Sequence, residues 1–200
     1  SKIIVDQLEK TGGALTALTL PVANATANQY IKNDGAGALS WATLPGGGKV
    51  LQALQPAAVT SNTLSTTSTA FVDIAGLTVA ITPSAVTSKI LVLFNVMMGT
   101  TGGWHGHVRI VRDSTAIGIG DLNGSRKQST SEASGGPISM GKPVPGIFLD
   151  SPSTTSATTY KLQWATESAG TIYLNRASTN TDNLNFGTFI STITVMEIGV

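Results

Sequence analysis

Short β-strand patterns recur about every ten residues from Lys49 onward, and no stretch of the chain shows a sustained helical period. Gly, Pro, Asn, Asp and Ser stand between the patterns, as turns require. This spacing predicts an antiparallel β-sandwich or jelly roll, and about 150 residues is a sufficient length for one such domain. The predicted strands are 50–54, 70–73, 77–82, 89–98, 105–112, 116–119, 144–149, 159–166, 171–174 and 188–198.

Two of these strands are apolar on both faces, which a two-layer sandwich with one solvated face does not explain. Strand 89–98 places Ile90, Val92, Phe94, Val96 and Met98 on one face and Leu91, Leu93 and Met97 on the other. The last strand likewise places Phe189, Ile193 and Val195 opposite Ile190, Met196 and Ile198. At roughly 25 cal/mol per Å² of buried apolar surface, covering the second face favours association. The pattern therefore predicts an obligate homo-oligomer.

Charge is scarce along the whole chain. Charged residues make up 12% of the sequence, about half of the roughly 25% of ordinary soluble domains, and 28 Thr, 19 Ser and 22 Gly take their place. The net charge of +1 argues against a nucleic-acid partner, which needs a basic surface. The lack of cysteine excludes disulfides and thiolate metal sites. No apolar run approaches the roughly 18 residues of a membrane span, so no membrane insertion is expected.

The first 45 residues differ from the rest in their residue pattern, which predicts an extended segment with one β-hairpin. Residues 29–32 and 39–44 are β-prone and flank a turn that contains Asp and Gly. Residues 46–49, Gly-Gly-Gly-Lys, predict a flexible hinge. The predicted organisation is thus an N-terminal segment (1–45), a hinge (46–49) and a C-terminal jelly-roll domain (50–200).

Several segments resemble the virion fibre proteins of tailed bacteriophages, especially phages of marine and cyanobacterial hosts. Residues 1–9 are similar to the starts of these proteins, and residues 27–41 resemble a short unit near the N-termini of many tail-fibre proteins. Residues 108–118, residues 124–126 and the ending 191–198 resemble their C-terminal heads. None of these segments carries a catalytic motif.

The resemblance implies a homotrimer that attaches to other virion proteins through its N-terminal segment and exposes a jelly-roll head of the tumour-necrosis-factor type. The implied function is non-enzymatic adhesion to the host surface, with a cell-surface glycan as partner. Two alternatives stay open: a purely structural head-fibre, decoration or collar component, and a glycan depolymerase. The expected location is the virion surface after synthesis in the host cytoplasm, because residues 1–6 are too few and too charged for a signal peptide.

The two histidines form one motif, His105-Gly106-His107. Residues i and i+2 of a strand share a face, so three copies around a threefold axis would present six imidazoles, a ligand set suited to a transition metal. The alternative interpretation is two polar residues on an outward face, with no cofactor at all.

Ligand-binding surfaces are expected on the long polar loops 123–144 and 177–183, because long loops on a rigid β-scaffold commonly carry them. A tryptophan at a loop–strand junction suits either stacking on a sugar ring or burial in a core or subunit interface. The predicted ligand-binding residues are Trp104, Arg126, Asn180 and Asp182.

The remaining charged residues have structural interpretations that compete with functional ones. Arg109, Arg112 and Arg126 either clamp an anionic sugar or pair with Asp113 or Asp121 to order turns. A glycan hydrolase needs two carboxylates about 5 to 10 Å apart across a sugar-sized cleft. Nearly all of the 11 carboxylates stand in predicted turns or strand ends, where they usually cap backbone amides. The sequence therefore predicts no enzyme and assigns no catalytic residue.

Overall fold

The structure, a computed structural model, describes residues 7–8, 18–27, 29–36, 38–43, 48–135 and 140–199. The chain divides into two compact units, Ser1–Gly47 and Gly48–Val200. Every regular element in the described ranges is a β-strand, which confirms the predicted all-β class. No helix within these ranges is long and apolar enough to cross a membrane.

The smaller unit contains two antiparallel strand pairs, β1 with β2 and β3 with β4. The second pair is the predicted hairpin. Asp34 shapes its turn because its carboxylate accepts two backbone N–H groups, and Gly35 takes the positive φ of 85° that a tight turn requires. The Trp41 indole donates to the Ala23 carbonyl at 2.6 Å. The strands are β1 (Gln7–Leu8), β2 (Leu18–Thr19), β3 (Gln29–Asn33) and β4 (Leu39–Thr43).

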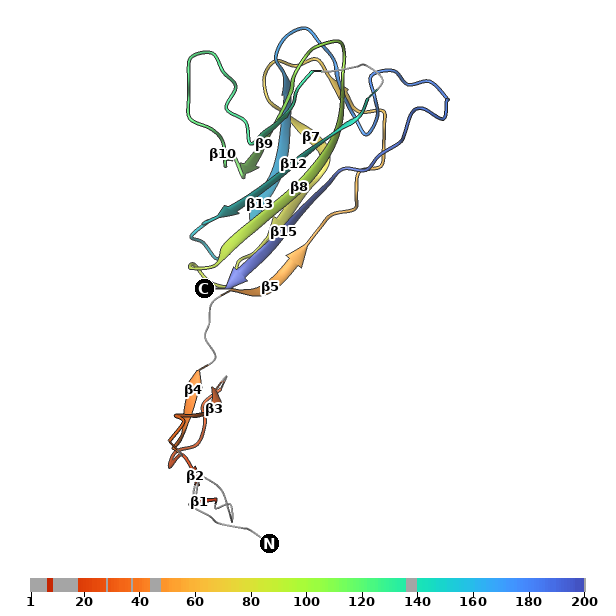
Figure 1. The fold of residues 1–200 in the computed structure, drawn as a ribbon. Coiled ribbons are helices and arrows are strands. Elements are labelled where there is room, and N and C mark those ends of the chain that lie inside the picture. Colours follow the sequence, from red (N-terminus) through yellow and green to blue (C-terminus); the bar gives the residue numbers. More distant parts are fainter. Residues whose placement is uncertain are drawn as a thin grey trace. The chain divides into compact units, whose positions relative to one another are not determined.

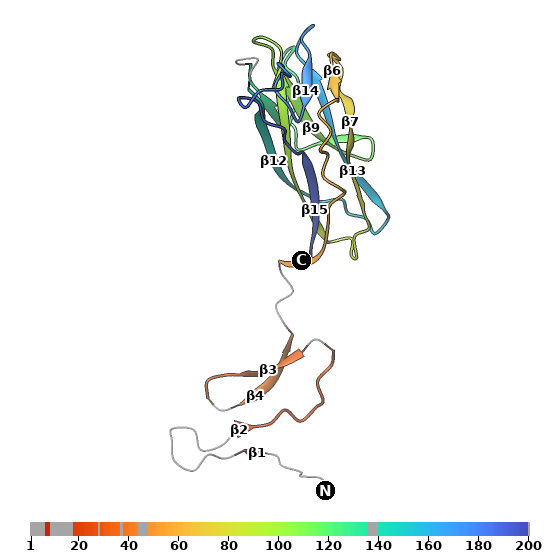
Figure 2. The same cartoon turned by 90° about the vertical axis from the view of Figure 1, so that its right-hand side faces the viewer.

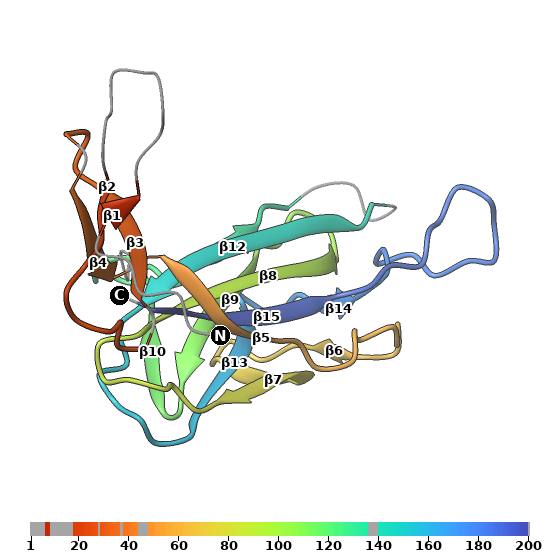
Figure 3. The same cartoon turned by 90° about the horizontal axis from the view of Figure 1, so that it is seen from below.

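The larger unit is a sandwich of two antiparallel sheets, seen as two layers in Figures 2 and 3. In one sheet β12 and β15 flank β8, β5 pairs with β15, and β14 and β6 extend the sheet beside the end of β8. In the other sheet β13 lies between β7 and β9, and β10 and β11 share the far edge of β9. This alternation of the strands between the two sheets is a jelly roll, as predicted.

The strand boundaries of the larger unit follow the sequence patterns closely (Figure 1). The strands are β5 (Lys49–Leu54), β6 (Ser65–Thr66), β7 (Val72–Ile81), β8 (Lys89–Thr100), β9 (Gly106–Arg112), β10 (Thr115–Ile117), β11 (Ser131–Ala133), β12 (Lys142–Asp150), β13 (Thr158–Thr166), β14 (Ile172–Leu174) and β15 (Thr192–Gly199).

Four details differ from the sequence-based expectation. The predicted strands 70–73 and 77–82 are one strand, β7, because an irregularity at Gly76, with a φ of 85°, carries the chain past a shift in register with β13. Strands β6 and β11 are too short to leave a pattern. The last strand begins at Thr192 instead of 188. Lys49, predicted to be in the hinge, is the first residue of β5, and hinge residues 46–47 lie outside the described ranges.

The core lies between the sheets and consists of alternate residues of their strands. The inward side chains of β8 are at most 5% exposed, and those of β13 and the first half of β15 are buried in the same way. This period-two burial confirms the inward face predicted for 89–98. Central members of the core are Ile90, Val92, Phe94, Val96, Met98, Tyr160, Leu162, Trp164, Ile193 and Val195.

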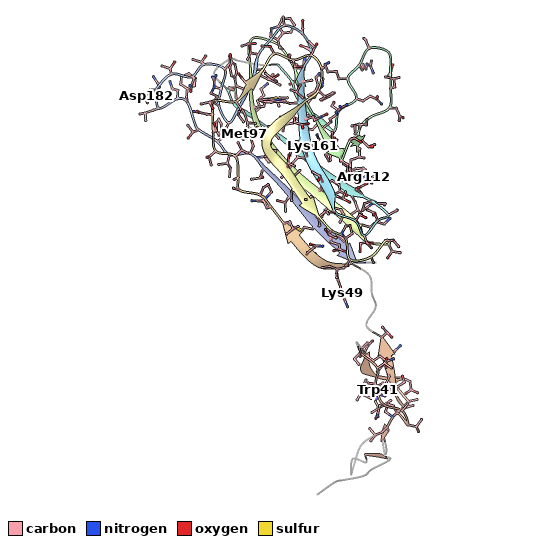
Figure 4. All side chains as sticks on the ribbon, turned by 180° about the vertical axis from the view of Figure 1, so that it is seen from behind. Trp41, Lys49, Met97, Arg112, Lys161 and Asp182 are labelled. Atoms are coloured by element: carbon pink, nitrogen blue, oxygen red, sulfur yellow. The ribbon has the colours of Figure 1, made fainter. Side chains whose placement is uncertain are left out.

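The two ends of the sandwich differ. At one end, called the base, Gly48 donates to the carbonyl of Gly199, so the chain enters and leaves the domain there. The opposite end, called the loop end, carries the connections 101–105, 167–171 and 175–191. Figure 4 shows Lys49 at the base and Asp182 far from it, on the long loop that projects at the loop end.

A buried polar cluster closes the base. Asp150 is 6% exposed and accepts from Arg112 at 2.9 Å and from the Tyr160 hydroxyl at 2.7 Å. Because the three residues lie on β12, β9 and β13, the cluster joins the two sheets. The sequence-based pairing of Arg112 with Asp113 or Asp121 is therefore wrong, since the packing of the two sheets brings Arg112 to Asp150 instead.

Glu197 forms a second buried cluster on the inward face of β15. Its side chain accepts from the Ser84 amide at 2.7 Å, from the Ser84 hydroxyl at 2.6 Å and from the Gln52 amide at 2.6 Å. Burial favours the protonated carboxyl, but the hydrogen bonds to the carboxylate outweigh it and lower the pKa of Glu197 to about 2.

We predict that Glu197 makes folding stability depend on pH in the acidic range. The pKa of Glu197 is about 2 in the folded chain and 4.5 in the ordinary carboxyl. Ionised Glu197 therefore stabilises the fold fully above pH 4.5, and this stabilisation disappears as the pH falls from 4.5 toward about 2. Urea unfolding from pH 2 to 6 measures the effect. Glu197→Gln should flatten the dependence, and Gln52→Met should flatten it partly. An unchanged slope in Glu197→Gln would contradict the assignment.

Candidate functional site

A polar cleft of about 380 Å³ opens on the outer side of the sheet that contains β9, toward its loop end. Three parts of the chain line it: β9 itself, β11 with the connection that leads into it, and the segment that follows β13. The lining side chains are His107, Ser125, Arg126, Lys127, Glu132 and Glu167. All six can donate or accept hydrogen bonds, so the cleft suits a polar ligand.

Strand register places two imidazole–carboxylate pairs in neighbouring rows. Glu132 on β11 stands opposite His107 on β9, and its Oε2 lies 3.4 Å from His107 Nδ1. The contact is not aligned as a hydrogen bond, so the buried Nδ1 has no hydrogen-bond partner among the described residues. Beside this pair, Glu167 accepts from the His105 amide at 3.0 Å and lies 2.9 Å from His105 Nδ1.

The surroundings set the charge states of His107 and Glu167. Burial lowers the pKa of His107 below the ordinary 6.5, and the negative charge of Glu132 opposes this shift only in part. The hydrogen bonds from His105 lower the pKa of Glu167. At neutral pH the cleft therefore contains an uncharged imidazole and an ionised Glu167 carboxylate.

The two cations of the cleft differ in how they are held. The Lys127 ammonium donates to the Thr69 carbonyl and lies 6.0 Å from the centroid of the Phe71 ring, which fixes it against the neighbouring chain segment. The Arg126 amide closes a turn by donating to the Asn123 carbonyl at 3.2 Å. Within the described part of the chain its guanidinium has no hydrogen bond or ion pair. Arg126 thus offers free donors to a ligand.

The structure distributes the predicted ligand-binding residues over different places. Arg126 lines the cleft. Trp104 is 39% exposed, and its ring packs against Gly170, where even a methyl group would collide with it. Asn180 and Asp182 line a separate polar hollow of about 310 Å³ on the long loop of the loop end. The four residues therefore do not form one site.

Within one chain, the two histidines have different partners and do not form a shared ligand set. His105 and His107 each face a different carboxylate, and no group of three or more His, Asp or Glu in the described ranges is placed to hold a metal ion. The metal site predicted at a threefold axis stays a prediction about several chains together.

Sequence reasoning did not assign Glu132, Glu167 or Lys127 to a site. Glu132 lies on a three-residue strand inside a region that reads as loop, and only its pairing with β9 brings it opposite His107. Glu167 follows a strand that was predicted correctly, so the antiparallel pairing of that strand with β9 was the one signal that could have found it.

The outer surface of the opposite sheet, called the apolar face, has the reverse character. Its side chains form cross-strand rows such as Ile147–Leu93–Thr194. Ile147 is 67% exposed and lines a shallow groove of about 460 Å³. The apolar face consists of Leu91, Leu93, Asn95, Met97, Pro143, Pro145, Ile147, Leu149, Thr192, Thr194, Met196 and Ile198. None of these twelve residues is charged, and Lys89, which shares this side of β8 at the base, donates to the Ser151 hydroxyl at 2.7 Å.

The outer surface of the β7–β13–β9 sheet, called the polar face, is held by charged hydrogen bonds. Arg109 donates to Gln163 at 2.7 Å, and Gln163 donates to Asp73 at 2.7 Å. Lys161 completes the row with a 2.8 Å ion pair to Asp73. The polar groups of this row pair with one another, whereas the apolar face leaves apolar groups uncovered.

We predict that the pKa of His107 lies below 6.5 and falls further in Glu132→Gln, because this substitution removes the negative charge that favours the imidazolium. NMR titration of the imidazole signals measures both values. Asp182→Asn, which changes a carboxylate of the other polar hollow, serves as the matched control and should leave the pKa of His107 unchanged. A value above 6.5 would contradict the burial of His107.

The sequence matches no protein-family model and no curated protein. Among solved structures, the chain is similar to infectious bursal virus derived T=1 particles, with 12% identity over 96% of this chain and a TM-score of 0.41. It is also similar to the infectious bursal disease virus VP2 subviral particle, with 13% identity over 96% of this chain and a TM-score of 0.39. The chain spans about half the length of these chains, 48% and 49%.

Proposed function

We propose that this chain is the subunit of a homotrimeric, non-enzymatic virion fibre protein that adheres to the host surface. The observation that carries the proposal is the uncharged apolar face on one side of the jelly roll, opposite a face of paired charges. The resemblance of residues 1–9, 27–41 and 191–198 to bacteriophage fibre proteins supports the virion location.

The chemistry of the apolar face favours a second copy of this chain as its cover. A face without charge gives no electrostatic selectivity for a partner of opposite sign, and its rows of aliphatic side chains match rows of the same kind. Every copy presents this face, because its residues belong to the paired strands β8, β12 and β15. Self-association can cover the faces of all copies at once.

The arrangement of the domain ends favours adhesion. The chain enters and leaves the larger unit at the base, and the long polar connections lie at the opposite end. The N-terminal segment is thus joined to the domain at the base, and the loop connections stand at the other end of the domain. Hydroxyl and amide side chains suit weak contacts with glycans, which three copies strengthen through avidity.

The chemistry of the cleft favours binding over catalysis. A glycosidase needs a carboxylic acid with a raised pKa as proton donor, whereas hydrogen bonds lower the pKa of Glu167. No metal belongs to the proposal either. If the apolar faces meet at the threefold axis, the histidine pair of each copy lies on the opposite sheet of its sandwich, away from that axis.

The oligomer is tested by Ile147→Lys, which places a charge on the apolar face midway along its edge strand β12, where Ile147 is exposed in the single chain. Light scattering should give a trimer mass for the unaltered chain and a monomer mass for the variant. Burial of unpaired ammonium groups should weaken association by at least about a hundredfold, or roughly 3 kcal/mol. Ala80→Lys, an equal change on an exposed position of the polar face, should stay trimeric. A monomeric unaltered chain would refute the proposal.

Adhesion is tested with the fluorescently labelled full chain on host cells. We expect saturable labelling that the unlabelled chain displaces, and much weaker labelling by monomeric Ile147→Lys because avidity is lost. A chain that labels no cells, but without which particles fail to assemble, indicates the structural alternative of a head-fibre, decoration or collar component. Release of reducing sugar from host envelopes would instead indicate a depolymerase.

A further inference from the structure

We propose that the polar cleft beside His107 is a binding site for an uncharged saccharide of one or two rings. This inference rests on the proposed adhesive function and names the ligand and its site. The volume of about 380 Å³ lies in the range of small-molecule sites, and three separate chain segments enclose it. The walls stand on β9 and β11, so strand pairing holds them in place.

The cleft presents donors and acceptors side by side, which is the pattern that adjacent sugar hydroxyls require. A hydroxyl both donates and accepts, so a ring with several hydroxyls is best matched by carboxylates next to cationic donors. Glu132 provides an acceptor that is about half exposed, at 52%. Arg126 provides N–H groups that no described residue uses.

The charges in the cleft balance. Arg126 and Lys127 contribute two positive charges, and Glu132 and Glu167 contribute two negative ones. His107 adds none at neutral pH because its burial lowers its pKa. An acidic sugar would gain from Arg126 but meet both carboxylates, and a cationic ligand would meet Arg126 and Lys127. The balance therefore favours a neutral saccharide over a charged one.

The state of His107 indicates that the cleft is built for an occupant. The ring is 12% exposed, and its Nδ1 is buried without a hydrogen-bond partner in the described structure. Buried polar atoms of this kind are rarely left unpaired. A ligand hydroxyl beside Glu132 can form the hydrogen bond with His107 Nδ1 that the poorly aligned Glu132 carboxylate does not form.

The position of the cleft keeps it accessible in the proposed trimer. His107 and Glu132 lie on the outer side of the sheet that faces away from β8, whereas the apolar face lies on the outer side of the sheet that contains β8. Association through the apolar face therefore leaves three cleft openings on the outside of the assembly. Three weak sites on one particle suit avid binding to a surface that repeats the same sugar.

The site is tested by applying the full-length trimer to an array of immobilised neutral hexosides, N-acetylhexosaminides, amino sugars and uronic acids. We expect binding to one or more neutral saccharides. Arg126→Ala and Glu132→Gln should each weaken it at least about tenfold, since each removes a charged hydrogen-bonding group. Lys49→Ala, which removes an exposed cation at the base of the domain, should bind like the unaltered chain. Addition of the bound sugar should shift the NMR signals of the His107 imidazole.

Three outcomes would overturn the inference: no binding to the array, binding confined to charged sugars, or binding that Asp182→Asn, in the other polar hollow, abolishes and Arg126→Ala does not. Thermal unfolding checks that the variants are folded, and within the described residues the Arg126 guanidinium has no hydrogen bond or ion pair whose loss would destabilise the chain. Failure of the site and failure of the proposed function remain distinguishable. A chain that labels host cells equally with and without Arg126→Ala keeps its adhesive function and loses only this site.

Discussion

Strand β8 has two apolar faces, and the need to cover both governs the rest of the domain. Its inward side chains are buried against the opposite sheet. Its outward side chains, Leu91, Leu93 and Met97, are only partly buried in the single chain because the neighbouring strands β12 and β15 lie beside them in the same sheet. In the proposed trimer, a sister subunit supplies the third layer over β8.

Buried polar side chains make the two ends of this sandwich rigid. At the base, Asp150 ties Arg112 to Tyr160 across the sheets. Toward the loop end, Asn175 has a φ of 58° and donates to the Val59 carbonyl at 2.6 Å, while its own oxygen accepts from Ser191 at 2.6 Å. Asn175 and Ser191 bound the long loop, so this hydrogen bond holds the two ends of the loop together. Binding loops gain affinity when their supports are rigid, because less entropy is lost on binding.

Most of the fold was predictable because it depends on local alternation of residues. The inward face of β8 and the hairpin in residues 29–43 can be read from period-two patterns and turn residues. The candidate site was not predictable from the sequence, because its residues come together only through the register of strands that are distant in the chain. Glu132 and His107 are 25 positions apart, and only the pairing of β11 with β9 joins them. Glu197 is another example: a carboxylate in an apolar alternation reads as an outward residue, yet Ser84 and Gln52 supply hydrogen bonds that allow it to be buried.

The low charge content follows from the same constraint on β8. A surface that associates with copies of itself, as we propose, disfavours uncompensated charge, since each charge would be desolvated in every interface. The twelve residues of the apolar face include none, and Lys89, beside them at the base, donates to the Ser151 hydroxyl. On the opposite sheet, Asp73 pairs with Lys161. Two different kinds of surface thus stand back to back on one sandwich. In the proposed trimer, sister subunits cover the apolar face, and the polar face with its cleft beside His107 lies on the outside of the assembly.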